Sequence, residues 1–305
     1  MNSNYLLDVT ITGALDFSIV DVFAEEKYAG NQLAVVKNAR SLSTSQMQKI
    51  ANEMHFSETT YILSRKQPNG GYDVRIFTPE KELQFAGHPT LGTAYVIKHL
   101  EPNNTAEQIL VNLKLGQIPV TFEKDEKNQE LLWMKQIKPI FGKKFDVEII
   151  SKILSLERNE VDSRYPIQEV STGLPFIIVP LKSLAAVKRA YVTRQGETKL
   201  LKEMKAGLLI YCAETYHTQN DLNVRVFVDA VGIPEDPATG SGNGCLAGYL
   251  SKYKYFGDEI INVRVEQGYE INRPSLLLLK TCKEKQGTSI HVGGKVVMIA
   301  NGTFL

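Results

Sequence analysis

The sequence predicts an α+β protein of two similar halves, each of which wraps strands around one buried helix. Short segments rich in β-branched and aromatic residues recur along the 305-residue chain. Two helices, beginning near residues 89 and 240, lack a polar face and are therefore expected in the interior. Segment Asp73–Thr78 is echoed by Asn223–Val228, and Ala86–His88 is echoed by Thr239–Ser241, which indicates an internal repeat.

In the first half, strand patterns alternate with two helical patterns. A helix is expected over 45–54, with Ser43 or Thr44 as its N-cap. Proline is favoured at the first helical position, so His88 is expected to cap a helix over 89–100. Strands are expected at 17–23, 32–37, 56–63, 71–77, 83–86, 108–113, 116–123 and 130–136.

A mixed connector over 137–165, with a short helix near 147–156, leads into the second half. Helices are expected at 183–189, at 197–205 and after residue 240. Strands are expected at 168–172, 176–180, 207–212, 223–228, 259–267, 275–282, 287–292 and 295–305. The predicted division is an extension at 1–16, an N-terminal half at 17–139 joined by the last strand (295–305), and a C-terminal half at 140–294.

Composition argues against several classes of protein. Hydrophobic content of 43% and charged content of 23% are typical of a globular chain, and a net charge of +1 predicts no nucleic-acid partner. The three cysteines have no Cys-x-x-Cys spacing, so neither a disulfide framework nor a metal site is expected. The N-terminus does not resemble a signal peptide, and no run of eighteen apolar residues occurs. We therefore expect a cytoplasmic protein with no membrane partner.

The segment Glu235–Gly244 combines an acidic pair, a proline and several glycines directly before an apolar helix. Such a composition is not expected to form regular strand. Free N–H groups at the start of a helix, with the helix dipole behind them, favour an anion. An ordinary glycine-rich turn with a capped helix is the alternative. A nucleotide site is disfavoured because no Lys-Ser/Thr follows the glycines.

A series of motifs spans nearly the whole chain, at 21–23, 30–31, 56–59, 75–79, 82–90, 173–175, 236–242, 267–268 and 273–275. In these segments, and in their order, the sequence resembles the PhzF (phenazine biosynthesis-like) family of the diaminopimelate-epimerase-like superfold. The resemblance implies two pseudo-symmetric halves, each a mixed sheet curled around a central helix, and a homodimer that needs no cofactor. Asn272 departs from the family pattern, in which glycine is more usual there.

The same superfold contains epimerases and proline racemases that use two opposed cysteine thiols. Here those places hold Ala86 and Thr239, which carry no group that titrates near neutral pH. Cys245 lies further along the second helix and is expected to be a small packing residue. Two-thiol racemisation is therefore not expected, and proton transfer must use carboxylates or histidine.

By resemblance, Glu58 is the acid/base, assisted by His88 and Asp236 as further catalytic residues. Phe56 and Tyr61 flank Glu58, and removal from water raises a carboxyl pKa toward neutrality. Each residue also has a plain structural interpretation: a solvated strand carboxylate for Glu58, a helix cap for His88, and an Asx-turn for Asp236.

The expected substrate is a small carboxylic acid. Ser241, with the amides of Gly87, Gly240 and Gly242, is expected to bind the substrate carboxylate between the two helix N-termini. The first functional hypothesis is a cofactor-independent isomerase that shifts a proton and a double bond. The family's named reaction is isomerisation of trans-2,3-dihydro-3-hydroxyanthranilate. The alternative is a non-catalytic carboxylate-binding or protein-interaction member of the same fold.

Overall fold

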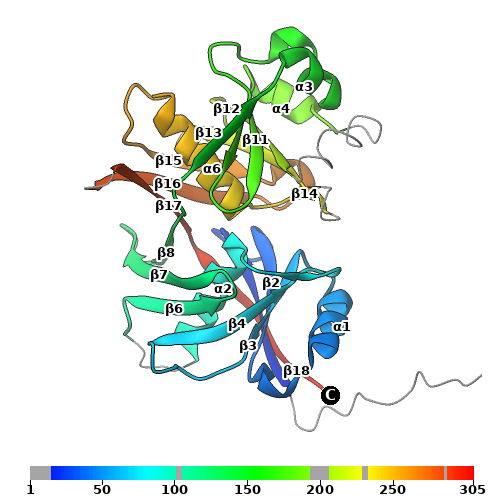
Figure 1. Cartoon of the computed structure of the whole chain (residues 1–305), viewed down its shortest axis with the longest axis vertical. Coiled ribbons are helices and arrows are strands. Elements are labelled where there is room, and N and C mark those ends of the chain that lie inside the picture. Colours follow the sequence, from blue (N-terminus) through cyan, green and yellow to red (C-terminus); the bar gives the residue numbers. More distant parts are fainter. Residues whose placement is uncertain (1–14, 101–104, 193–205, 229–232, 285–286) are drawn as a thin grey trace, which may run out of the picture.

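The computed structural model describes residues 15–100, 105–192, 206–228, 233–284 and 287–305. Two lobes are stacked along its long axis, and each contains a central helix, α2 (Gly87–His99) in one and α6 (Gly240–Lys252) in the other (Figure 1). The first lobe also contains helix α1 (Thr44–Met54), and the second contains α3 (Val147–Ile153) and α4 (Leu184–Arg189).

The strands of the two lobes pair in the same order. In the first lobe these are β1 (Leu15–Val22), β2 (Asn31–Val36), β3 (Glu58–Ile62), β4 (Gly71–Phe77), β5 (Glu82–Leu83), β6 (Gln108–Leu113), β7 (Gly116–Lys124) and β8 (Glu130–Lys135). In the second lobe these are β10 (Gln168–Ser171), β11 (Pro175–Pro180), β12 (Gly207–Cys212), β13 (Leu222–Val228), β14 (Ile233–Asp236), β15 (Asn262–Gln267), β16 (Ser275–Glu284) and β17 (Gly287–Gly294). The pairs β2–β3, β4–β6, β11–β12 and β13–β15 are parallel and the remaining neighbours antiparallel, which confirms the mixed sheets.

The strand that follows the last strand of each lobe in sequence crosses over and pairs with the first strand of the other lobe. Strand β9 (Ile140–Lys144) follows β8 in sequence and pairs with β10. Strand β18 (Val296–Phe304) follows β17 and pairs with β1. A direct pairing of β8 with β17 connects the lobes. On these pairings we propose the division into 17–139 with the last strand and 140–294.

The central helices are buried because their sequences are apolar on every side. Helix α6 is buried from Gly240 to Ser251, and α2 exposes part of its surface only from Tyr95 onward. One hydrophobic cluster includes Leu91 of α2 and Leu246 of α6. Helix α1 closes a separate cluster around Tyr61 in the first lobe, and α3 and α4 cover β11 and β12 in the second. Both helices therefore begin deep inside the molecule.

The internal repeat extends to an ion pair in each lobe. Arg75 donates to both carboxylate oxygens of Glu82 at 2.7 Å, and Arg225 donates to those of Glu235 at 2.9 and 2.7 Å. Each guanidinium also lies 5.0 Å from the ring centre of the phenylalanine two residues later. The equivalent pairs brace the turns that lead into α2 and α6.

Some local predictions were wrong. Glu235 and Asp236 lie in strand β14, because pairing with β13 continues up to the proline. Helix α2 begins at Gly87 with Ala86 as its N-cap, since the His88 ring turns into the site instead of capping. Strand β1 begins at Leu15, within the predicted extension. Strand β9 was not predicted, and the helix expected at 197–205 lies outside the described residues.

Candidate active site

The N-termini of α2 and α6 meet at the junction between the lobes. A Cβ atom added to Gly87 would lie 3.1 Å from the amide nitrogen of Ser241 and 3.2 Å from Cα of Gly240. A Cβ atom on Gly240 would lie 3.5 Å from Cα of Gly87. A side chain at Gly87 would therefore crowd the backbone at the start of α6, whereas the distance from Gly240 to Gly87 is that of an ordinary contact. The first-turn N–H groups, which have no partner within their helix, converge from both lobes.

The predicted residues Gly87, Gly240, Ser241 and Gly242 all belong to these first turns and are all buried. Ala86 and Thr239 are the N-caps of the two helices, as expected from the positions that the sequence resemblance assigns to them. Two dipole ends and several amides therefore point into one small region. This arrangement is suited to a carboxylate.

Glu58 and His88 face each other beside this junction. Glu58 begins β3 and His88 lies in the first turn of α2; their side chains are 12% and 5% exposed. The distance from His88 Nε2 to Glu58 Oε2 is 3.3 Å. Neither atom has a hydrogen-bond partner, so the contact is close but poorly aligned. Two buried polar atoms are thus available to a third molecule.

Asp236 reaches the same place from the other lobe. It ends β14, and its carboxylate accepts hydrogen bonds from Asn31 at 2.9 Å and from the Thr239 hydroxyl at 2.5 Å. The structure therefore brings together the three residues predicted to be catalytic, Glu58, His88 and Asp236, which are widely separated in the sequence.

Burial changes the protonation of all three groups. It raises the pKa of Glu58 well above its usual value, with the nearby Asp236 charge adding to the effect. It lowers the pKa of His88 to about 3, although a hydrogen bond to the Gln32 backbone works in the opposite direction. It raises the pKa of Asp236 to about 6, against the hydrogen bonds from Thr239, Asn31 and Ser57. Such perturbed groups clustered in one place indicate a functional site.

Two amide side chains complete the site and were not identified from the sequence. Asn31 Nδ2 lies 2.9 Å from Asp236 Oδ1, 3.0 Å from the Ala238 carbonyl and 3.3 Å from His88 Nδ1. Gln267 Nε2 donates to the Asp236 carbonyl at 2.8 Å and to the Thr239 hydroxyl at 3.0 Å. Both lie in motifs that carry the family resemblance, which was the only signal available for them.

Arg273 fixes the backbone that leads to Asn31. Its guanidinium donates to the Ala29 and Gly30 carbonyls at 2.6 and 2.9 Å and to Asp21 at 2.7 Å. The preceding Asn272 has φ 57°, a left-handed conformation that asparagine adopts more readily than most residues. This explains how asparagine replaces the more usual glycine in that turn.

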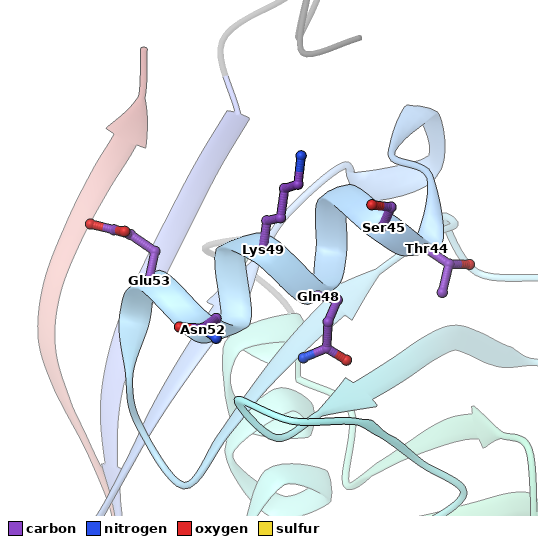
Figure 2. A pocket seen from close by; sticks show the side chains of 6 residues that line it. All are labelled: Thr44, Ser45, Gln48, Lys49, Asn52 and Glu53. Carbon is purple, nitrogen blue, oxygen red and sulfur yellow. The ribbon is translucent and has the colours of Figure 1, made fainter. Parts of the chain in front are cut away.

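A surface pocket lies elsewhere, on the outer face of α1, and is lined by Thr44, Ser45, Gln48, Lys49, Asn52 and Glu53 (Figure 2). It contains none of the site residues described above. Across the described ranges, no group of three or more His, Cys, Asp or Glu side chains is arranged to hold a metal ion. Nor is any helix in that part of the chain long and apolar enough to cross a membrane.

Comparison with known proteins shows the family to which this chain belongs. A family model described as "Phenazine biosynthesis-like protein" matches residues 20–302. The chain belongs to the PhzF family. A PhzF-family phenazine biosynthesis protein of Bacillus anthracis has a crystal structure that matches with a TM-score of 0.88 at 28% identity, covering 96% of this chain and 99% of that one. A hydroxyproline epimerase of Agrobacterium vitis, at 8% identity and a TM-score of 0.60, shares the fold.

Several curated relatives of this PhzF-family chain are named isomerases. Trans-2,3-dihydro-3-hydroxyanthranilate isomerase of Pseudomonas chlororaphis is 32% identical over 297 residues, which cover 95% of this chain and 99% of the relative. An uncharacterized isomerase of Mesorhizobium japonicum is 31% identical over 295 residues, covering 94% and 97%. The protein is an isomerase of the PhzF family.

Proposed function

We propose that this PhzF-family isomerase moves a proton, and with it a double bond, within a small carboxylic acid, and that Glu58 carries the proton. The observation behind the proposal is the buried Glu58 carboxyl group beside His88 and Asp236, in which Glu58 Oε2 and His88 Nε2 have no hydrogen-bond partner. No cofactor is needed for the step. The carboxylate takes a proton from one carbon, and the electron pair left behind shifts the double bond. The carboxyl group, whose proton exchanges with solvent, then delivers a proton to another carbon.

A raised pKa suits Glu58 to both parts of this step. A carboxyl group with an ordinary pKa is a weak base and releases its proton to water near neutral pH. Burial raises the pKa of Glu58, which strengthens the carboxylate as a base and keeps the acid available to return the proton. Glu58 lies on β3, a strand buried along its length, so its position is set by a rigid element.

The helix N-termini are proposed to bind the substrate carboxylate. Gly87, Gly240, Ser241 and Gly242 supply backbone N–H groups in a buried, dipole-favoured position. Asp236, whose pKa of about 6 leaves it largely ionised above neutral pH, is proposed to bind an amino or hydroxyl group of the substrate. His88 is proposed to contact the substrate beside Glu58 and to assist the movement of the proton.

The named relatives suggest the first substrate to test, trans-2,3-dihydro-3-hydroxyanthranilate. Wild-type protein is expected to convert it, and Glu58→Gln is expected to bind it with little change in Kd but to lose turnover by about 10²-fold or more. Glu53→Gln is the matched control, because Glu53 is an exposed carboxylate on α1 (Figure 2). Retained turnover in Glu58→Gln would rule out the assigned role. Wild-type protein that is inactive on this compound would exclude the substrate only.

A non-catalytic carboxylate-binding role is the alternative. In that role the Glu58 carboxyl group would transfer no proton. The alternative therefore predicts that wild-type protein binds small carboxylates without exchange of protons between the bound compound and solvent. The buried, unpartnered acid beside a neutral histidine favours the isomerase. The homodimer and the cytoplasmic location remain predictions.

A further inference from the structure

Strand register shows which positions of the two lobes are equivalent. Leu33 pairs with the first residue of β3, and Phe176 pairs with the first residue of β12. Two residues earlier stand Asn31 and Leu174, each directly preceded by a glycine with positive φ. Asn31 of the first lobe is therefore the counterpart of Leu174 of the second.

The predicted catalytic residues also differ from their counterparts. The pairings of β4 with β5 and of β13 with β14, together with the starts of the two central helices, identify the equivalent positions. At these positions an ionisable side chain in one lobe is replaced by a different residue type in the other. The counterparts of Glu58, His88 and Asp236 are Gly207, Ser241 and Leu83, respectively. Asn31 therefore shares a property with the three predicted catalytic residues: its counterpart in the other lobe is a residue of a different type.

The fold itself does not require an amide at this position, since leucine occupies it in the other lobe. A buried amide costs free energy unless it is hydrogen-bonded. Asn31 is 1% exposed, and its Nδ2 faces two oxygen acceptors, Asp236 Oδ1 at 2.9 Å and the Ala238 carbonyl at 3.0 Å. These two oxygens fix the orientation of the amide, because the reversed group would oppose oxygen to oxygen.

The same nitrogen lies 3.3 Å from Nδ1 of His88. One side chain therefore touches the two ionisable groups that stand beside Glu58, one from each lobe. The Gly30 and Ala29 carbonyls, just before Asn31, are held by Arg273, and the Gly30 N–H donates to the Pro274 carbonyl at 3.0 Å. The amide is thus set on a backbone that the second lobe immobilises.

We propose that Asn31 is a positioning residue that holds the Asp236 carboxylate of one lobe against His88 and Glu58 of the other. This inference rests on the proposed function for its meaning, but the Asn31–Asp236 hydrogen bond can be tested without measuring turnover. By donating a hydrogen bond to Asp236, Asn31 favours the ionised carboxylate. Without that bond, Asp236 would be easier to protonate and freer to leave the site.

Other groups also act on Asp236 and would remain in an Asn31 variant. Thr239 and Ser57 donate hydrogen bonds that favour the ionised form. Burial and the neighbouring charge of Glu235 disfavour it. Glu58 faces the same carboxylate from β3. Loss of Asn31 should therefore shift the titration of Asp236 upward without removing it.

The test is an NMR titration of protein labelled with ¹³C at aspartate carboxyl carbons, with the Asp236 signal assigned from its absence in Asp236→Asn. In Asn31→Leu and Asn31→Ala the pKa of Asp236 is expected to rise by about one unit or more. Leu174→Asn is the matched control and is expected to leave that pKa unchanged.

An unchanged pKa of Asp236 in the folded Asn31 variants would overturn the proposal. Failure of both variants to fold would also overturn it, because the amide would then be a requirement of the fold. The titration uses no substrate, so a failed turnover assay leaves its result intact. The two hypotheses are therefore tested separately.

Discussion

Glu58 Oε2 and His88 Nε2 lie 3.3 Å apart inside the junction of the two lobes, and neither atom has a hydrogen-bond partner. Burial raises the pKa of Glu58 and lowers that of His88 to about 3, so both groups favour their neutral forms. They therefore do not form a stable ion pair. A carboxyl oxygen without a hydrogen-bond partner beside a neutral imidazole is a site prepared for a polar ligand rather than a structural contact.

Replacing Glu58 should change how stability depends on pH. Its folded-state pKa exceeds the unfolded value, so the folded protein holds the proton more tightly. Wild-type unfolding free energy is therefore expected to fall as pH rises from about 4.5 through the folded pKa. Glu58→Gln lacks this loss and should gain stability relative to wild type between about pH 5 and pH 8. Urea unfolding of both proteins at about pH 5 and at about pH 8 tests this. The same difference in unfolding free energy between Glu58→Gln and wild type at the two pH values would contradict it.

Asp236 should set one limb of the pH–rate profile. Its pKa is about 6, and the ionised form is the one proposed to bind a substrate amino or hydroxyl group. We expect kcat/KM to rise with pH through about 6, and we expect Asp236→Asn to lose that limb together with most activity. Steady-state rates between about pH 4.5 and 8 measure it. A limb that persists in Asp236→Asn would have to be assigned to another group.

Gly87→Ala should force the two central helices apart. The added methyl group would lie 3.1 Å from the Ser241 amide and 3.2 Å from Cα of Gly240, and these backbone atoms cannot turn away. We expect a loss of about 1–3 kcal/mol in unfolding free energy and weaker binding of small carboxylates. Ser241→Ala, which adds no atoms at the junction, serves as the control for stability. Gly87→Ala with wild-type stability and binding would show that the helices have room to separate.

Arg273→Gln should destabilise the link between lobes. The substitution removes hydrogen bonds to the Ala29 and Gly30 carbonyls and leaves Asp21, which is 3% exposed, without its cation. We expect a cost of about 2–4 kcal/mol, of which Asp21→Asn in the same chain should recover a part. Chemical unfolding of the two single variants and the double variant gives the coupling energy. Full additivity of the two changes would show that Arg273 and Asp21 are not coupled.

Much of the fold followed from local pattern. Apolar helices and alternating strands have periodicities that a short window reveals, and the repeated anchors at Arg75 and Arg225 located equivalent turns. Strand β9 was not predicted because it is largely exposed and contains lysines, so its sequence resembles that of a connector. The cap of α2 was wrongly predicted because the His88 ring lies against Asn31 in the site, a contact remote in sequence that no local rule anticipates.

The site was predictable only where a residue type suggests its chemistry. Glu58, His88 and Asp236 are ionisable and drew attention through the family resemblance. Asn31 and Gln267 are uncharged amides whose importance comes from partners remote in sequence, such as Asp236 for Asn31. Contacts between lobes, rather than any periodicity, define their roles.

The most direct test of the account is deuterium incorporation during turnover in D₂O. With trans-2,3-dihydro-3-hydroxyanthranilate as substrate, wild-type protein and Glu53→Gln are expected to yield product that carries deuterium at the carbon receiving the proton. Glu58→Gln is expected to bind the compound and incorporate none. Deuterated product from Glu58→Gln at the wild-type rate would contradict the claim that Glu58 carries the proton.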